Sequence, residues 1–165
     1  MSNELDIRHA TVSDILKIIS LWKELFQFHE SMDRGFEVIP DAEEKFIPFL
    51  KSVIELQEEK KAVVLVAQSP FDKQLIGYVL GMIGKNTPIF TIQDYGYITD
   101  MCVTRDSRQQ GVGRKLVEEV KNWFYTQGIN RIQLHAASAN PVSLAFWKKM
   151  GFTTYMEKMS CDLQK

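Results

Sequence analysis

The sequence has only two cysteines and no long apolar run, and its first residues do not resemble a targeting segment. Cys102 and Cys161 lie far apart and lack metal-ligand spacing, so we expect two reduced thiols and no metal site. No apolar stretch approaches the roughly 20 residues that a membrane span requires. The first residues contain neither the basic region nor the apolar region of a secretory signal. Together these absences predict a cytoplasmic protein without a membrane partner.

The sequence has no large excess of positive or negative charge, since its formal net charge is −1 at pH 7. A nearly neutral chain has no whole-molecule attraction for nucleic acid. Acidic residues interrupt the basic ones between Arg105 and Lys115, and no nucleic-acid-binding motif accompanies them. We therefore expect no nucleic-acid partner. With 165 residues and 45% hydrophobic content, the chain suits one core, and we expect a single domain over residues 1–165.

Hydrophobic periodicity predicts an α/β fold with a mixed sheet and a central β–α–β unit. Strands are expected over residues 5–10, 62–67, 75–83, 95–103 and 131–136, with one or two more between 152 and 161. Helices are expected after Thr11, from Asp41, after Gly111, and from Asn140 to Gly151. Thr11 followed by Asp14 resembles a capping box, and Gly128 suits a helix C-terminus.

The most informative segment is the turn between the strand ending at Val103 and the helix that follows it. The turn contains Gly111 and Gly113, which carry no Cβ and allow a ligand to approach the backbone. A helix N-terminus also presents free N–H groups and favours negative charge. Arg108 and Arg114 flank the turn and are able to bind an anion. The pattern is typical of a pyrophosphate-binding turn.

Two familiar nucleotide-binding motifs do not fit this turn. The dinucleotide fingerprint requires a third glycine, but Leu116 occupies that position. The mononucleotide P-loop requires Lys and Ser or Thr after its last glycine, and neither follows Gly113. A plain helix start, with glycines that allow close packing, remains the structural alternative.

The pattern Arg108-x-x-Gly111-x-Gly113 resembles the coenzyme A pyrophosphate loop of the GNAT superfamily of N-acetyltransferases. A second segment, from Leu134 through Asn140 to Phe152, resembles the second motif of that family. The two motifs occur in the family's order and cover roughly residues 95 to 155. The resemblance implies a single-domain GNAT-like fold, with a mostly antiparallel mixed sheet and splayed parallel strands. It also implies acetyl-CoA as co-substrate.

The resemblance assigns the cofactor to the gap between two parallel strands. It implies that the backbone N–H groups of Met101, Cys102 and Val103 bind the thioester carbonyl and the pantetheine arm. Cys102 itself is expected to be a small buried side chain and not a nucleophile. Asn140 is expected to cap a helix, to contact pantetheine, or both. The remaining implied cofactor contacts are Arg108, Gln109, Gln110, Gly111, Val112, Gly113, Arg114 and Trp147.

Acetyl transfer to an amine requires a group that removes a proton from the ammonium. His135 is the leading candidate, because a neutral imidazole accepts a proton at physiological pH. Tyr97 matches a strand position that carries a catalytic Glu or Tyr in some relatives and is the second catalytic candidate, as a water-holding group or an acid and not as a free base. Asp100 is a secondary carboxylate candidate. For each of them a purely structural role is the alternative.

The sequence defines the acceptor and the activity less closely than it defines the cofactor site. Many relatives have Tyr where this chain has Trp147, and an indole N–H does not release a proton at neutral pH. This difference supports an alternative hypothesis, an acyl-CoA-binding regulatory protein with little or no activity. For an enzyme, Glu30 and Asp33 in the segment 22–40 suit a cationic amine acceptor. Family precedent favours a homodimer.

Overall fold

The computed structural model describes residues 5–163, which form two compact units divided after His135. The first unit contains a five-stranded sheet and three α-helices. Its strands are β1 (Asp6–His9), β2 (Ala62–Gln68), β3 (Leu75–Lys85), β4 (Asp94–Val103) and β5 (Ile132–Leu134). Its α-helices are α1 (Ile15–Glu30), α2 (Ala42–Glu55) and α3 (Val112–Thr126). Short 3-10 helices are η1 (Val12–Asp14), η2 (Arg34–Phe36) and η3 (Arg105–Ser107).

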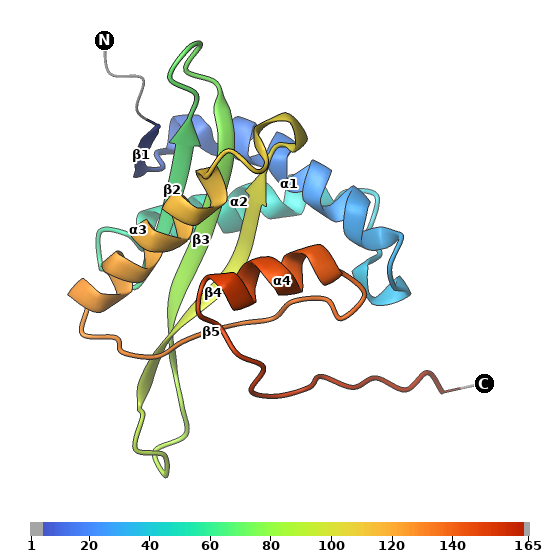
Figure 1. The fold of residues 1–165 in the computed structure, drawn as a ribbon, viewed down its shortest axis with the longest axis vertical. Helices are drawn as coiled ribbons and strands as arrows, with labels where there is room; N and C mark the ends of the chain where they lie inside the picture. Colours follow the sequence, from blue (N-terminus) through green and yellow to red (C-terminus); the bar gives the residue numbers. More distant parts are fainter. Residues whose placement is uncertain (1–4, 164–165) are drawn as a thin grey trace. The chain divides into compact units, whose positions relative to one another are not determined.

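The sheet is mixed, with the strands in their sequence order from β1 to β5. The first four strands pair antiparallel, whereas β4 and β5 pair in parallel and are connected through α3. Helices α1 and α2 lie on one face of the sheet and α3 lies on the other (Figure 1). The predicted α/β fold with a central β–α–β unit and a mostly antiparallel sheet is therefore confirmed.

The face covered by α1 and α2 carries the larger core. Ile18, Leu50, Val64, Tyr78 and Cys102 are members of this buried cluster. Strand β2 is buried on both faces along nearly its whole length, as its continuous apolar run predicts. Trp22 of α1 stacks on Phe46 of α2 with ring centroids 4.7 Å apart. These contacts fix α1 beside the strands that carry the candidate site.

On the opposite face of the sheet, the packing of α3 depends on two glycines that lie beneath a single aromatic ring. A Cβ added to Gly81 or Gly96 would lie 2.8 Å from ring atoms of Phe124 in α3. Real Cβ atoms do not approach that closely, so glycine at both positions allows α3 to pack directly on β3 and β4. The close packing of α3 brings its N-terminus next to the end of β4.

The start of α1 is anchored by a buried acid. The Thr11 N–H donates to Oδ2 of Asp14 at 2.8 Å, which confirms the predicted capping interaction, although η1 precedes the α-helix. Arg8 of β1 donates to both oxygens of Asp14, at 2.7 and 2.9 Å. This hydrogen-bonded pair is the main reason that the pKa of Asp14 falls to about 2.

The second unit contains α4 (Pro141–Lys149). Asn140 caps this helix, because its Oδ1 accepts the N–H of Ser143 at 3.0 Å, and Pro141 occupies the first turn. The prediction of one or two strands between 152 and 161 was wrong, since the described residues of this segment form none. A strand needs a hydrogen-bonded partner, so apolar and aromatic side chains alone do not create one. None of the helices in residues 5–163 is long and apolar enough to cross a membrane.

Candidate active site

The candidate site begins where β4 and β5 separate. The two strands pair over only three positions, from Gly96 opposite Ile132 to Ile98 opposite Leu134. Strand β5 ends there, whereas β4 continues to Val103. The part of β4 after Ile98 therefore has no paired strand along the edge that faces β5. This is the strand separation that the resemblance predicted.

The N–H groups that face this open edge follow from the register of β4. The Thr104 N–H donates to the Ile76 carbonyl at 2.9 Å, so it faces β3. Because backbone groups alternate along a strand, the N–H of Cys102 also faces β3. The N–H groups of Met101 and Val103 then face the open edge. Of the three predicted backbone donors, two are oriented for a ligand in the gap.

A β-bulge at Thr99 changes which side chains of β4 share a face. Leu80 of β3 lies opposite Asp100, but the next residue, Gly81, lies opposite Ile98. Thr99 is the extra residue, and it shifts the two-residue alternation by one position. Without this bulge, Tyr97 and Asp100 would point to opposite faces of the sheet.

With the bulge, Tyr97 and Asp100 lie on the face covered by α1 and α2. Tyr97 lies opposite Met82 and Asp100 lies opposite Leu80. Both β3 partners belong to, or pack against, the core cluster of that face. Directly opposed residues in an antiparallel pair point to the same side. The bulge therefore brings a phenol and a carboxylate to the same face beside the strand opening.

The two predicted catalytic residues lie together, Tyr97 on β4 and His135 directly after the end of β5. Oη of Tyr97 and Nδ1 of His135 are 2.6 Å apart, and the rings meet edge to face. Burial, followed by the nearby Tyr95, raises the pKa of Tyr97, so its phenol remains neutral at physiological pH. A neutral phenol is able to accept the Nδ1–H of the imidazole, which leaves Nε2 free to accept a proton.

The predicted phosphate turn lies at the end of the same strand. Gly111 has a φ of +85° and forms the N-cap of α3, while Gln109 has a φ of +61°. Both values lie in the left-handed region, which glycine adopts most readily. The first helical bond that involves Gly111 runs to its carbonyl from the Lys115 N–H. Helix α3 therefore offers no acceptor to the N–H groups of Val112, Gly113 and Arg114.

Glu24 is a residue that sequence reasoning missed. Its Oε1 accepts the Arg105 N–H at 3.1 Å and Nη2 of Arg108 at 3.0 Å. Nε of Arg108 donates to the Val103 carbonyl at 2.9 Å. The Arg108 side chain, predicted as a phosphate contact, thus links α1 to the end of β4. Glu24 is 84 positions from Arg108 in sequence, so no local pattern indicates the contact.

The buried thiol of Cys102 is not activated. Burial is the main reason that its pKa rises to about 12, and the nearby Glu24 raises it further. Arg108 opposes this rise, while Asp100 adds to it. A thiol with such a pKa is protonated at physiological pH and is a poor nucleophile. This agrees with its expected role as a small core residue.

The two acids predicted to suit a cationic acceptor have backbone partners in the segment between α1 and α2. Oδ1 of Asp33 accepts the Gly35 N–H at 2.7 Å at the start of η2. Oε1 of Glu30 accepts the Val38 N–H at 3.4 Å. Both carboxylates therefore have backbone partners. These hydrogen bonds give both residues a structural role in the loop.

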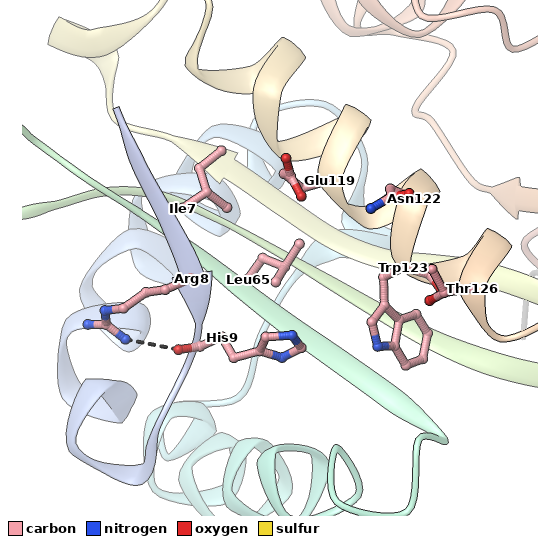
Figure 2. Close-up of a pocket in the computed structure, with 8 residues that line it drawn as sticks. All are labelled: Ile7, Arg8, His9, Leu65, Glu119, Asn122, Trp123 and Thr126. Atoms are coloured by element: carbon pink, nitrogen blue, oxygen red, sulfur yellow. Dashed lines mark hydrogen bonds between the residues drawn. The ribbon is translucent and has the colours of Figure 1, made fainter. Parts of the chain in front are cut away.

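A separate cavity of about 190 Å³ lies between β1, β2 and α3 (Figure 2). It is open, and its lining includes His9 and Trp123 but none of the candidate site residues. No group of three or more His, Cys, Asp or Glu side chains in the described part of the chain is arranged to hold a metal ion.

Comparison with known proteins identifies the family. A sequence profile described as the Acetyltransferase (GNAT) family matches residues 20–152. The chain belongs to this family. The GNAT profile includes both segments on which the resemblance was based, the glycine turn and the region from Leu134 to Phe152.

Several solved structures resemble this GNAT chain over nearly its full length. Glucosamine-6-phosphate N-acetyltransferase from Arabidopsis thaliana is 21% identical, with 98% of this chain and 99% of that chain covered and a TM-score of 0.72. An aminoglycoside antibiotic 6'-N-acetyltransferase from Acinetobacter baumannii is 16% identical, with coverages of 98% and 99% and a TM-score of 0.76. A predicted acetyltransferase from Clostridium acetobutylicum, solved with acetyl-CoA, is 21% identical, with both coverages 96% and a TM-score of 0.74. At these identities the likeness establishes a common fold.

Two predicted cofactor contacts of this GNAT chain belong to the second unit. Asn140 uses its side-chain oxygen to cap α4. Trp147 packs edge to face against Phe146 and Phe152, with ring centroids 5.1 and 5.3 Å apart. The capping role of Asn140 is therefore present within that unit.

Proposed function

We propose that the protein is an acetyl-CoA-dependent N-acetyltransferase that acetylates a primary amine by direct attack in a ternary complex. The observation that carries this proposal is the open edge of β4, which leads directly to the N-terminal turn of α3. One strand thus provides both donors for a thioester and access to donors for a pyrophosphate. The named acceptors of two similar structures, glucosamine-6-phosphate and aminoglycosides, are also amines.

The backbone supplies the cofactor site in this proposal. The N–H groups of Val112, Gly113 and Arg114 bind the pyrophosphate, favoured by the positive end of the α3 dipole. The N–H groups of Met101 and Val103 face the pantetheine arm and the thioester. A strand N–H directed at the carbonyl oxygen also stabilises the oxyanion that forms when the amine attacks. Arg108 has a positioning role, since its guanidinium already binds Glu24 and the Val103 carbonyl.

His135 is the proposed general base, with Tyr97 as its positioning partner. Tyr97 Oη lies 2.6 Å from Nδ1. In this proposal Nδ1–H donates to the phenol oxygen, and Nε2 accepts the proton that the ammonium loses before the amine attacks. The amine nitrogen forms a bond to the thioester carbon, and the carbon–sulfur bond breaks. The leaving thiolate takes up, through water, the second proton that the nitrogen loses as the amide forms, because Trp147 is unable to donate one as an acid.

Calorimetric titration with acetyl-CoA tests the cofactor site. The informative variant is Gly113→Glu, which adds a carboxylate in the first turn of α3 and repels the pyrophosphate. Glutamate is a better helix former than glycine and is favourable at a helix N-terminus, so this variant is expected to fold. Tyr125→Glu is the matched control, because it adds the same charge at an exposed position near the other end of α3.

We expect the wild type and the control to bind acetyl-CoA at micromolar concentrations, whereas Gly113→Glu loses at least about tenfold in affinity. Coenzyme A release on adding primary amines then establishes transfer. A folded wild type that does not bind acetyl-CoA would exclude the proposed function. Binding without release for any amine would favour the regulatory alternative, which Trp147 suggests.

A further inference from the structure

The cavity between β1, β2 and α3 lies away from the candidate active site. Strand β1 forms one edge of the sheet, whereas the candidate site lies where β4 and β5 separate near the other edge. The volume of the cavity is about 190 Å³. One water requires only roughly 10–15 Å³ of such space, so a small organic group fits.

The cavity exists because α3 covers only part of its face of the sheet. Val120 and Phe124 of α3 are buried and pack closely on β3. The flank of α3 beside this buried stripe instead faces Ile7 of β1 and Leu65 of β2 across the cavity (Figure 2). The two strands thus contribute an apolar side to the cavity.

The side chains on this flank of α3 are mostly polar. The residues of α3 that line the cavity are Glu119, Asn122, Trp123 and Thr126. Their spacing of three and four positions places them on one side of the helix. The same spacing makes the Glu119 carboxylate a neighbour of both the Asn122 amide and the Trp123 indole. A negative charge, an amide and an aromatic ring therefore line one side of the cavity together.

The Glu119 carboxylate has no cation partner in the part of the chain that the structure describes. None of the ion pairs there includes it. Arg8 also lines the cavity, but its guanidinium binds both oxygens of Asp14, at 2.7 and 2.9 Å. The ring of His9 is held at Nδ1 by Oε1 of Gln57, 3.0 Å away. A cationic ligand would therefore meet a carboxylate that is not already neutralised.

The arrangement on α3 suits a planar cation better than a point charge. A guanidinium binds a carboxylate through two parallel N–H groups. It also stacks on aromatic faces and is more weakly hydrated than an ammonium ion. Glu119 and Trp123 offer these two partners one helical turn apart, and the side-chain oxygen of Asn122 is able to accept a further N–H.

We propose that this cavity binds a small guanidinium compound. Its charge pairs with Glu119, its planar face lies against Trp123, and its alkyl part lies on Ile7 and Leu65. None of these residues belongs to the candidate active site. This second site is therefore independent of the proposed N-acetyltransferase function.

Calorimetry on the full-length protein with N-propylguanidinium tests the site. This probe has no primary amine, so acetyl transfer does not complicate the titration. N-propylurea is its neutral planar counterpart, and butylammonium has the same charge without the planar group. Glu119→Gln removes the charge, and Glu118→Gln is the matched control, because Glu118 lies on the same helix but does not line this cavity. Trp123→Leu removes the stacking partner, and Tyr125→Leu is its control at an exposed position of α3.

We expect the wild type to bind N-propylguanidinium with a Kd below about 1 mM, and N-propylurea at least about tenfold more weakly. Glu119→Gln should weaken binding of the probe at least about tenfold, and Trp123→Leu about 3–10-fold. Both controls should stay within about twofold of the wild type. The affinity for acetyl-CoA should remain nearly unchanged in every variant.

Nuclear magnetic resonance locates the bound probe. The indole N–H signal of Trp123 should shift on titration, whereas that of Trp22, which is buried between α1 and α2, should not. If Trp123→Leu does not fold, this signal and the two glutamate variants decide the result.

Several outcomes overturn the proposal. Equal losses in Glu118→Gln and Glu119→Gln would show a diffuse attraction to the charged surface. Absence of wild-type binding at about 10 mM probe, or binding of N-propylurea with equal affinity, would exclude a guanidinium site. Butylammonium that binds as tightly as N-propylguanidinium would contradict the proposed ligand class.

Discussion

Oη of Tyr97 lies 2.6 Å from Nδ1 of His135, across the parallel pair formed by β4 and β5. The contact joins two side chains that are 38 positions apart in sequence. Tyr97 is paired with Gln133, and His135 directly follows Leu134, the last paired residue of β5. The phenol and the imidazole therefore form one unit at the opening into which the proposed thioester extends.

His135→Ala should lower kcat by roughly 100-fold, because it removes the proposed base. Tyr97→Phe should lower kcat by about 3–10-fold, since the imidazole loses the partner that orients Nδ1–H. The double variant should be no slower than His135→Ala, because the two residues act together. Steady-state kinetics with saturating acetyl-CoA measures these effects, and His9→Ala is the control. Independent effects that multiply would contradict the coupled pair.

Glu24→Gln should raise KM for acetyl-CoA by about 3–10-fold with little change in kcat, because the phosphate turn loses its link to α1. Arg108→Ala should have a similar effect, and the double variant should resemble each single variant. Glu43→Gln is the control, since it disrupts an exposed pair with Lys23. A lower KM in Glu24→Gln would instead mean that the released Arg108 binds phosphate directly.

The two cysteines should react very differently with a thiol reagent. Cys161 is exposed, whereas Cys102 is buried and has a pKa raised to about 12. In the native protein we expect one thiol to react rapidly, and the second only after unfolding. Cys102→Ala should retain most activity. Rapid labelling of Cys102, or loss of activity beyond about 100-fold in a folded variant, would point to a direct chemical role.

The pair formed by Arg8 and Asp14 should contribute strongly to stability. The Asp14 side chain is only 3% exposed, and Asp14→Asn should reduce the free energy of unfolding by about 2–4 kcal/mol at pH 7. The folded-state pKa is about 2, below the ordinary value near 4. The stabilisation is therefore complete above the unfolded-state pKa and is lost as the pH falls towards 2.

Urea unfolding at pH 7 and pH 3 measures this contribution. The difference between wild type and Asp14→Asn should shrink at the lower pH. Asp41→Asn is the matched control, because its pair with Lys45 is exposed and should contribute less than about 1 kcal/mol. A constant difference at both pH values would mean that Asp14 stabilises the fold independently of its charge.

Local patterns in the sequence were sufficient to predict the turn that forms the proposed phosphate site. The left-handed backbone at Gly111 and the free N–H groups that follow it depend on a few consecutive residues. The caps at Thr11 and Asn140 are local for the same reason. The continuous apolar run of β2 also predicted a strand covered on both faces, because each such position must find an apolar neighbour.

The arrangement of the side chains beside the strand opening was decided only by the tertiary structure. A period of two would place Tyr97 and Asp100 on opposite faces, and the unpaired residue Thr99 reverses that arrangement. The bulge is a property of the register between β3 and β4, so β4 alone does not reveal it. The contact between Glu24 and Arg108 likewise requires α1 to pack near the end of β4. The sequence by itself determined where backbone donors are free, because that depends on neighbouring residues. Only the tertiary structure decided which side chains share the site, because that depends on how distant strands and helices pair and pack.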